Sequence, residues 1–175
     1  MKCNGVLNRD SKRKYLSQVN TCNDDEQHIV HIISGDKFTV GYIKFMEIYF
    51  EKYRKTFISF RGNPAFDDKC LTQDKNVIIL DKVASIVFDD KIVHLLNSAD
   101  KIIVSCVSIQ NHLVRLGHPI LKKCYLQFWG GDFYGYRNIR IRDIRTFKRK
   151  VYDEPNLRKC IKNCAGVINL IHGDW

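Results

Sequence analysis

The chain has 175 residues, of which 45% are hydrophobic, and 29 Lys and Arg against 19 Asp and Glu give it a formal net charge of +10. This length and apolar content fit one domain with a genuine core and are too small for two. No apolar run reaches the roughly 20 residues that span a bilayer. The segment Met1–Lys14 also lacks the apolar stretch of a signal peptide, so we expect a cytoplasmic protein.

The seven cysteines, an odd number scattered between Cys3 and Cys164, do not resemble the framework of a small secreted domain. We therefore interpret them as reduced thiols. Cys160 and Cys164, with His172 nearby in sequence, lack the second ligand pair of a zinc site. The sequence predicts neither a metal nor a cofactor.

Residues 1–27 have few large apolar side chains and mixed charge, and we predict a disordered leader there. Residues 28–175 alternate between segments of strand and of helix character. The predicted strands span His28–Ile33, Thr56–Phe60, Asn76–Leu80, Lys101–Ser105, Lys123–Phe128 and Val167–Ile171. The predicted helices span Thr39–Tyr53, a segment that ends near Asn97, Ile109–Leu116 and Leu157–Cys164.

Strands that are separated by helices require crossover connections, so the sheet is predicted to be mainly parallel and the fold a doubly wound, Rossmann-like α/β sandwich. Within the first predicted helix, apolar residues recur at helical spacing and indicate a stripe that faces the core. This stripe consists of Tyr42, Phe45, Met46, Tyr49 and Phe50.

The segment Gln127–Arg137 combines two adjacent glycines, an acid, several aromatic residues and a guanidinium directly after the fifth predicted strand. Glycine lets a backbone turn sharply and approach a ligand closely, and ligands of open α/β sheets sit beyond the carboxyl ends of the strands. The alternative is a tight turn whose aromatic side chains pack against the edge of the core. The candidate binding residues are Trp129, Gly130, Gly131, Asp132, Tyr134 and Arg137.

Tyr125–Tyr134 resembles the Trp-Gly-(Gly/Ala)-Asp-(Leu/Phe)-Tyr motif of the TDP-N-acetylfucosamine:lipid II N-acetylfucosaminyltransferases, also called 4-α-L-fucosyltransferases or glycosyltransferase family 56. His28–Asp36 and Ala99–Val104 agree with that family in order and spacing, so the resemblance covers roughly 29–175. It implies the N-terminal half of an inverting, metal-independent GT-B enzyme. Such an enzyme moves an amino-deoxyhexose from a TDP-linked donor to a polyprenyl-diphosphate-linked saccharide at the cytoplasmic face of the bacterial inner membrane.

The resemblance also implies a second domain that makes most of the contacts to the nucleotide sugar. The chain ends at Gly173-Asp-Trp175, directly after a predicted strand. We therefore expect an interrupted sequence, either a fragment or a shortened gene product, that is inactive alone.

Three predicted strand ends carry polar or glycine-rich residues that are expected to converge on one crevice: Gly35-Asp36, Ser105-Cys106 and Gly130-Gly131-Asp132. Inverting transfer needs a general base, for which a carboxylate is suitable. Asp132 is the first candidate and Asp36 the second, although Asp36 also fits a helix N-cap. Members of the family carry His-Gly where this chain has Ser105-Cys106, so the chain lacks that imidazole. Either it uses another residue in that role, or its activity is altered or absent.

The densest positive charge lies between Arg137 and Lys150, where Asp143 is the one acid. This cluster is suited to anionic lipid head groups or to the diphosphate of the acceptor. The alternative is a solvated helix face that keeps the domain soluble. The residues assigned to this contact are Arg140, Arg142, Arg145, Lys148 and Arg149.

Other function classes fit less well. Ser34–Thr39 has one glycine where a dinucleotide-binding fingerprint needs three, and neither a phosphate loop nor a nucleophile elbow occurs. A nucleic-acid binder would use the basic segment with Tyr134, Tyr136 and Phe147, but no binding motif accompanies them, so no nucleic-acid partner is expected. A receiver-like signalling domain would use Asp81, but the first strand is followed by only one acid.

Overall fold

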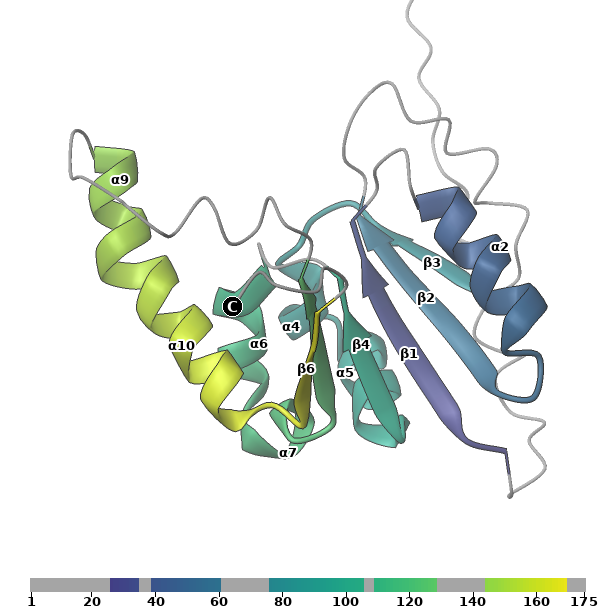
Figure 1. Cartoon of the computed structure of the whole chain (residues 1–175). Coiled ribbons are helices and arrows are strands. Elements are labelled where there is room, and N and C mark those ends of the chain that lie inside the picture. The colour runs from purple at the N-terminus through teal and green to yellow at the C-terminus, as the bar shows by residue number, and fades with distance from the viewer. Residues whose placement is uncertain (1–25, 35–38, 61–75, 106–108, 129–143, 170–175) are drawn as a thin grey trace, which may run out of the picture.

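The computed structural model describes residues 26–34, 39–60, 76–105, 109–128 and 144–169. Six strands form one sheet in the order β3-β2-β1-β4-β5-β6, and every neighbouring pair is parallel (Figure 1). The predicted Rossmann-like, parallel α/β class is confirmed. The strands are β1 His28–Ile33, β2 Arg54–Phe60, β3 Val77–Leu80, β4 Lys101–Val104, β5 Cys124–Phe128 and β6 Gly166–Asn169.

This strand order is the one in which the chain reverses its winding direction between the first and fourth strands. A receiver-like fold has the order 2-1-3-4-5, with the third strand beside the first. Here β3 lies at the sheet edge beside β2, so the receiver-like alternative is wrong.

Helices cover the two faces of the sheet unequally (Figure 1). On one face α2 packs across β1, β2 and β3 through Ile43 and Met46. The opposite face packs against α4, α5, α6, α7 and α10. The helical segments are α2 Thr39–Tyr49, α4 Ser85–Phe88, α5 Asp90–Ser98, α6 Gln110–Leu116, α7 His118–Leu121, α9 Ile144–Lys148, the π-helix η2 Arg149–Asp153 and α10 Glu154–Asn163.

The alternation of side chains along each strand builds two separate cores. Val30 and Ile32 of β1 point toward the five-helix face, whereas Ile33 points toward α2. In β2, Ile58 points toward the five-helix face and Phe57 points toward α2. The core on the five-helix face is much the larger of the two, and it supplies most of the buried apolar surface.

The predicted apolar stripe of the first helix is wrong for most of its members. The face that α2 buries consists of Thr39, Ile43 and Met46, at i, i+4 and i+7 spacing. Phe45, Tyr49 and Phe50 are exposed, and their rings contact one another with centroids 4.8 Å and 6.0 Å apart. Only one side of the helix contacts the sheet, so most of the apolar residues of the predicted stripe stay exposed to solvent.

Several predicted boundaries also change. The first helix ends at Tyr49 rather than Tyr53, because β2 begins at Arg54, two residues before the predicted start. Between β3 and β4 two helices replace one, since Asp89 has an extended backbone and its carboxylate accepts a hydrogen bond from the Lys91 amide, which begins α5.

Four helical segments were not predicted or begin earlier than expected. Helix α10 begins at Glu154, three residues before the predicted Leu157, with Pro155 in its first turn. The segments α7, α9 and η2 had no predicted counterpart. Within the described residues, none of the helices has the length and apolar character needed to cross a bilayer.

Candidate functional site at the strand ends

The carboxyl ends of β1, β4 and β5 lie side by side at the point where the winding reverses. In the sheet register Ile32 is opposite Val104, and Val104 is opposite Leu126. The backbone amide of Ser105 donates to the carbonyl oxygen of Ile32 over 2.8 Å. The three strand ends from which the candidate loops start therefore share one edge of the sheet, whereas the convergence of the loops on one crevice stays a prediction.

The loops themselves fall outside the described residues. This applies to most of the residues singled out above: Gly35, Asp36, Trp129, Gly130, Gly131, Asp132, Tyr134, Arg137, Arg140 and Arg142. Their predicted roles stay predictions. Ser105, Arg145, Lys148 and Arg149 are described.

A chain of four hydrogen-bonded side chains runs across the α2 face of the sheet toward this edge. His31 Nδ1 lies 2.9 Å from the hydroxyl of Tyr42 on α2. The Tyr42 hydroxyl is also hydrogen-bonded to the side chain of Ser105. Ser105 Oγ donates to Gln127 Oε1 over 2.6 Å. The chain thus links β1, α2, the end of β4 and β5.

The position of each hydrogen in this chain follows from the number of donors. Ser105 has one hydroxyl hydrogen, which it donates to Gln127, so its oxygen accepts the hydrogen of Tyr42. The Tyr42 oxygen then accepts from His31 Nδ1–H. This places the lone pair of His31 on Nε2, an atom that is buried and has no hydrogen-bond partner among the described residues.

The surroundings of His31 keep it neutral. Its ring stacks on Phe57 with centroids 4.9 Å apart, and no part of the side chain is exposed. Burial, together with the smaller effect of the positive charge of Lys55, lowers the pKa of His31 to about 4. A base this weak does not take a proton from a sugar hydroxyl near neutral pH. His31 therefore serves as a hydrogen-bond donor and does not compete with a carboxylate for the role of base.

Tyr42 also stays protonated. Burial raises the pKa of its phenol to about 12. Since no member of the chain ionises near neutral pH, its function is positional. It holds Ser105 and Gln127 at the edge and ties α2 to β4 and β5.

Sequence reasoning selected Ser105 but missed His31, Tyr42 and Gln127. A signal was present, because two of them interrupt otherwise apolar strands, His-Ile-Val-His-Ile-Ile and Cys-Tyr-Leu-Gln-Phe. A buried polar residue in such a strand requires a partner. The partner on α2 could not be identified, because Tyr42 was counted among the apolar residues of the stripe.

The opposite face offers no comparable polar site among the described residues. Cys124 and Cys160 are buried free thiols whose pKa values burial raises to about 12. Within the described part of the chain, no group of three or more His, Cys, Asp or Glu side chains is arranged to hold a metal ion. The thiols therefore act as core side chains.

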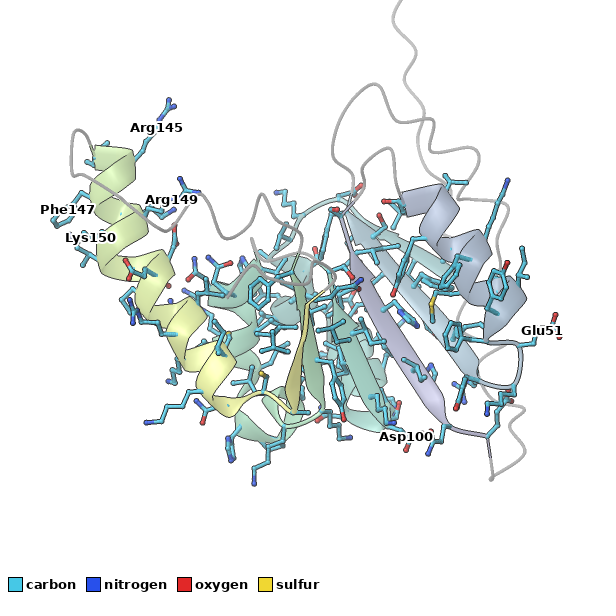
Figure 2. All side chains as sticks on the ribbon, viewed as in Figure 1. Glu51, Asp100, Arg145, Phe147, Arg149 and Lys150 are labelled. Carbon is cyan, nitrogen blue, oxygen red and sulfur yellow. The ribbon has the colours of Figure 1, made fainter. Side chains whose placement is uncertain are left out.

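The described residues of the basic cluster lie far from the polar chain in the fold. Arg145, Lys148 and Arg149 are exposed on the helical segment formed by α9 and η2. Figure 2 shows Arg145 and Arg149 on one side of this segment and Phe147 with Lys150 on the other. The basic side chains are thus divided between two sides of one helix.

Comparison with known proteins adds no identification: no protein-family model, no curated protein and no solved structure matches this chain.

Proposed function

We propose that this domain forms the acceptor side of an inverting glycosyltransferase that moves an amino-deoxyhexose of the N-acetylfucosamine type from a nucleotide diphosphate to a polyprenyl-diphosphate-linked saccharide. One observation carries the proposal. The motif that resembles the family begins at Trp129, the residue directly after β5, whose carboxyl end adjoins that of β4, one strand from the reversal of winding between β1 and β4. Open α/β sheets bind their ligands at this position.

The chemistry assigns different tasks to the loops and to the polar chain. Inverting transfer needs a carboxylate within hydrogen-bond reach of the acceptor hydroxyl, opposite the departing nucleotide diphosphate. We assign that role to Asp132, with Asp36 as the second candidate. The polar chain supports this role indirectly, because Ser105 and Gln127 fix the strand ends from which the catalytic loops start.

This proposal also accounts for the absence of the histidine that the family has at position 105. Where the family has His-Gly, Ser105 directs its hydroxyl into the buried contact with Gln127. A side chain held in this way does not serve as a base or as a phosphate ligand. Proton abstraction therefore depends on the acids of the neighbouring loops.

The proposal is tested by a transfer assay with a TDP-linked amino-deoxyhexose and a polyprenyl-diphosphate-linked acceptor. In a protein that joins this domain to a donor-binding domain, Asp132→Asn keeps the shape of the residue and removes the proton acceptor, so turnover should fall roughly 10²-fold to 10⁴-fold with little change in stability. The matched control is Asp143→Asn in the same connecting segment, which should leave turnover unchanged. Near-normal turnover in Asp132→Asn together with a large loss in Asp36→Asn would move the base to Asp36.

A second assay tests the assignment to the acceptor side. The domain alone should bind the acceptor but transfer no sugar, because a GT-B site is built from two facing domains. Turnover near the ordinary enzyme range of about 1 per second or above by the domain alone would contradict the assignment.

A further inference from the structure

We propose that the segment formed by α9 and η2 is an interfacial helix that lies on an anionic lipid surface, with Ile144, Phe147 and Val151 inserted and Lys148 and Lys150 at the head groups. The proposal does not depend on glycosyl transfer, and it uses only residues that the structure describes. It begins from the exposure of three large apolar side chains on one helical segment: Ile144 is 84% exposed, Phe147 51% and Val151 56%.

These three side chains form a continuous stripe. Residues three or four positions apart are neighbours on a helix surface, and the stripe follows that spacing from Ile144 to Phe147 and from Phe147 to Val151. Exposed apolar surface of this kind commonly marks an interaction site. Because no member is buried, the stripe contributes nothing to the core of the domain and is available to a partner.

Charge indicates which partner covers the stripe. Residues 144–152 contain four basic residues and no acid. The next two residues, Asp153 and Glu154, are engaged within the protein: Asp153 accepts a hydrogen bond from Asn111 over 2.7 Å, and Glu154 pairs with Arg158 at 2.7 Å. An apolar stripe in a segment that is rich in basic residues and contains no acid is typical of helices that bind anionic membranes.

The fold presents this segment at a distance from the sheet. Helix α10 packs on the core through Leu157 and Cys160. Two hydrogen bonds from α6 hold the junction between η2 and α10. Arg115 donates to the Tyr152 hydroxyl over 3.4 Å, and the Asn111 side chain donates to Asp153. Before this junction the helix continues away from the sheet, with α9 at its outer end (Figure 1). The stripe can therefore reach a flat surface.

The two sides of the segment make the proposal specific. Phe147 and Lys150 share one side, and Arg145 and Arg149 share the other (Figure 2). A helix with its side chains is about 10–12 Å across, and the Debye length is about 8 Å at 0.15 M salt. Lys148 follows Ile144 by four residues and therefore lies beside the stripe. Charges on the far side are largely screened from the membrane, so Lys148 and Lys150 should contribute more than Arg145 and Arg149.

Nucleic acid is the competing partner for a basic helix, but the composition of the stripe favours lipid. Nucleic-acid surfaces use aromatic side chains on which bases stack. Two of the three inserted side chains, Ile144 and Val151, are aliphatic and branched, and they suit an acyl boundary better than a base.

The experiment is co-sedimentation of the full chain with phosphatidylcholine vesicles that contain or lack phosphatidylglycerol, at low salt and at 0.15 M. Since each basic residue near an anionic surface contributes about fivefold in binding, Lys148→Gln/Lys150→Gln should weaken binding by about 25-fold. Arg145→Gln/Arg149→Gln, which changes the charge equally, should weaken it by about fivefold or less. Phe147→Asn should weaken it by about tenfold. Phe88→Asn, at an exposed phenylalanine followed by two acids, should change it by less than about twofold.

Three results would overturn the proposal. Equal binding to vesicles with and without phosphatidylglycerol would remove the role of charge. Equal losses from the two double variants, with no loss from Phe147→Asn, would indicate diffuse attraction without insertion. Tighter binding to a labelled single-stranded RNA than to the anionic vesicles would assign the surface to nucleic acid. Because all substituted side chains are exposed, circular dichroism should show unchanged folding in every variant.

Discussion

The two faces of the sheet bury different kinds of side chain. The face covered by α4, α5, α6, α7 and α10 is filled by apolar residues from the strands and helices that meet there. The face covered by α2 has a much smaller apolar cluster and a buried chain of four polar side chains that leads to the strand ends. Stability is thus concentrated on one face, whereas the other holds the geometry of a candidate ligand edge.

The energetic cost of this division falls on the α2 face. Buried polar groups require partners, and a chain of hydrogen bonds is favourable only where each member is satisfied. Among the four side chains of this hydrogen-bonded series, His31 Nε2 is the atom that departs from this rule. A polar chain with one unpartnered nitrogen contributes less stability than an apolar core of the same size, which is the pattern expected where position matters more than stability.

The largest difference in the free energy of unfolding should come from substituting two neighbouring residues that lie on opposite faces of β4. Ile102 is fully buried on the five-helix face, whereas Ile103 points toward the α2 side and is half-buried. Ile102→Ala should lower the free energy of unfolding by about 2–5 kcal/mol through lost transfer energy and a cavity. Ile103→Ala should cost about 1 kcal/mol or less. Urea unfolding measures both, and equal losses would mean that the two faces contribute alike.

The pH dependence of stability isolates the polar face. The pKa of His31 is lowered from about 6.5 in the unfolded chain to about 4 in the folded one. Between these values the unfolded state binds more protons, so stability is full above pH 6.5 and falls as the pH decreases toward 4. The difference corresponds to at most about 3 kcal/mol, since one pKa unit is about 1.4 kcal/mol.

His28 has a similarly lowered pKa, so a variant is needed to separate the two histidines. In His31→Asn the amide nitrogen can replace Nδ1 as the donor to Tyr42 and does not titrate. Urea unfolding at pH 4.5 and pH 7.5 should show a smaller difference for this variant than for the wild type. An unchanged pH dependence would assign the acid sensitivity to His28 or to other groups.

A smaller effect is expected from removing the central hydroxyl of the chain. Tyr42→Phe leaves the His31 donor and the Ser105 oxygen without their shared partner, at a cost of about 1–3 kcal/mol. Tyr49→Phe on the same helix removes a hydroxyl from a side chain that is 69% exposed and should change stability by less than about 0.5 kcal/mol. Thermal unfolding compares them, and equal effects would argue against a cooperative polar chain.

The sequence predicted the sheet well, because periodic apolar runs define buried strands directly. It also predicted which strand ends are polar, since Ser105 and the glycines after Phe128 follow such apolar runs in the sequence. It failed on α2, where Phe45 and Tyr49 have helical spacing but lie outside the contact with the sheet. The periodicity of a helix gives the set of residues that can share a face, whereas the area of the opposing surface decides which are buried.

The polar chain could not be predicted for a related reason. His31 and Gln127 were recognisable as polar residues in apolar strands, but the residue that joins them comes from α2, and its orientation depends on how that helix crosses β1. In the segment from Ile144 to Asp153, sequence reasoning selected the basic residues and Phe147 but not the other apolar residues. Only the helical conformation shows that its apolar residues lie together and that its basic residues are divided between two sides.

The central claim is that the acceptor binds at the carboxyl ends of β1, β4 and β5. The direct measurement is amide chemical-shift mapping of the isotopically labelled domain during titration with a water-soluble, short-chain polyprenyl-diphosphate saccharide. The account predicts the largest shifts at the carboxyl ends of these strands, at Ile33, Ser105 and Phe128. Shifts concentrated instead at their amino ends, at His28, Asp100 and Lys123, or an unchanged spectrum at saturating ligand, would contradict it.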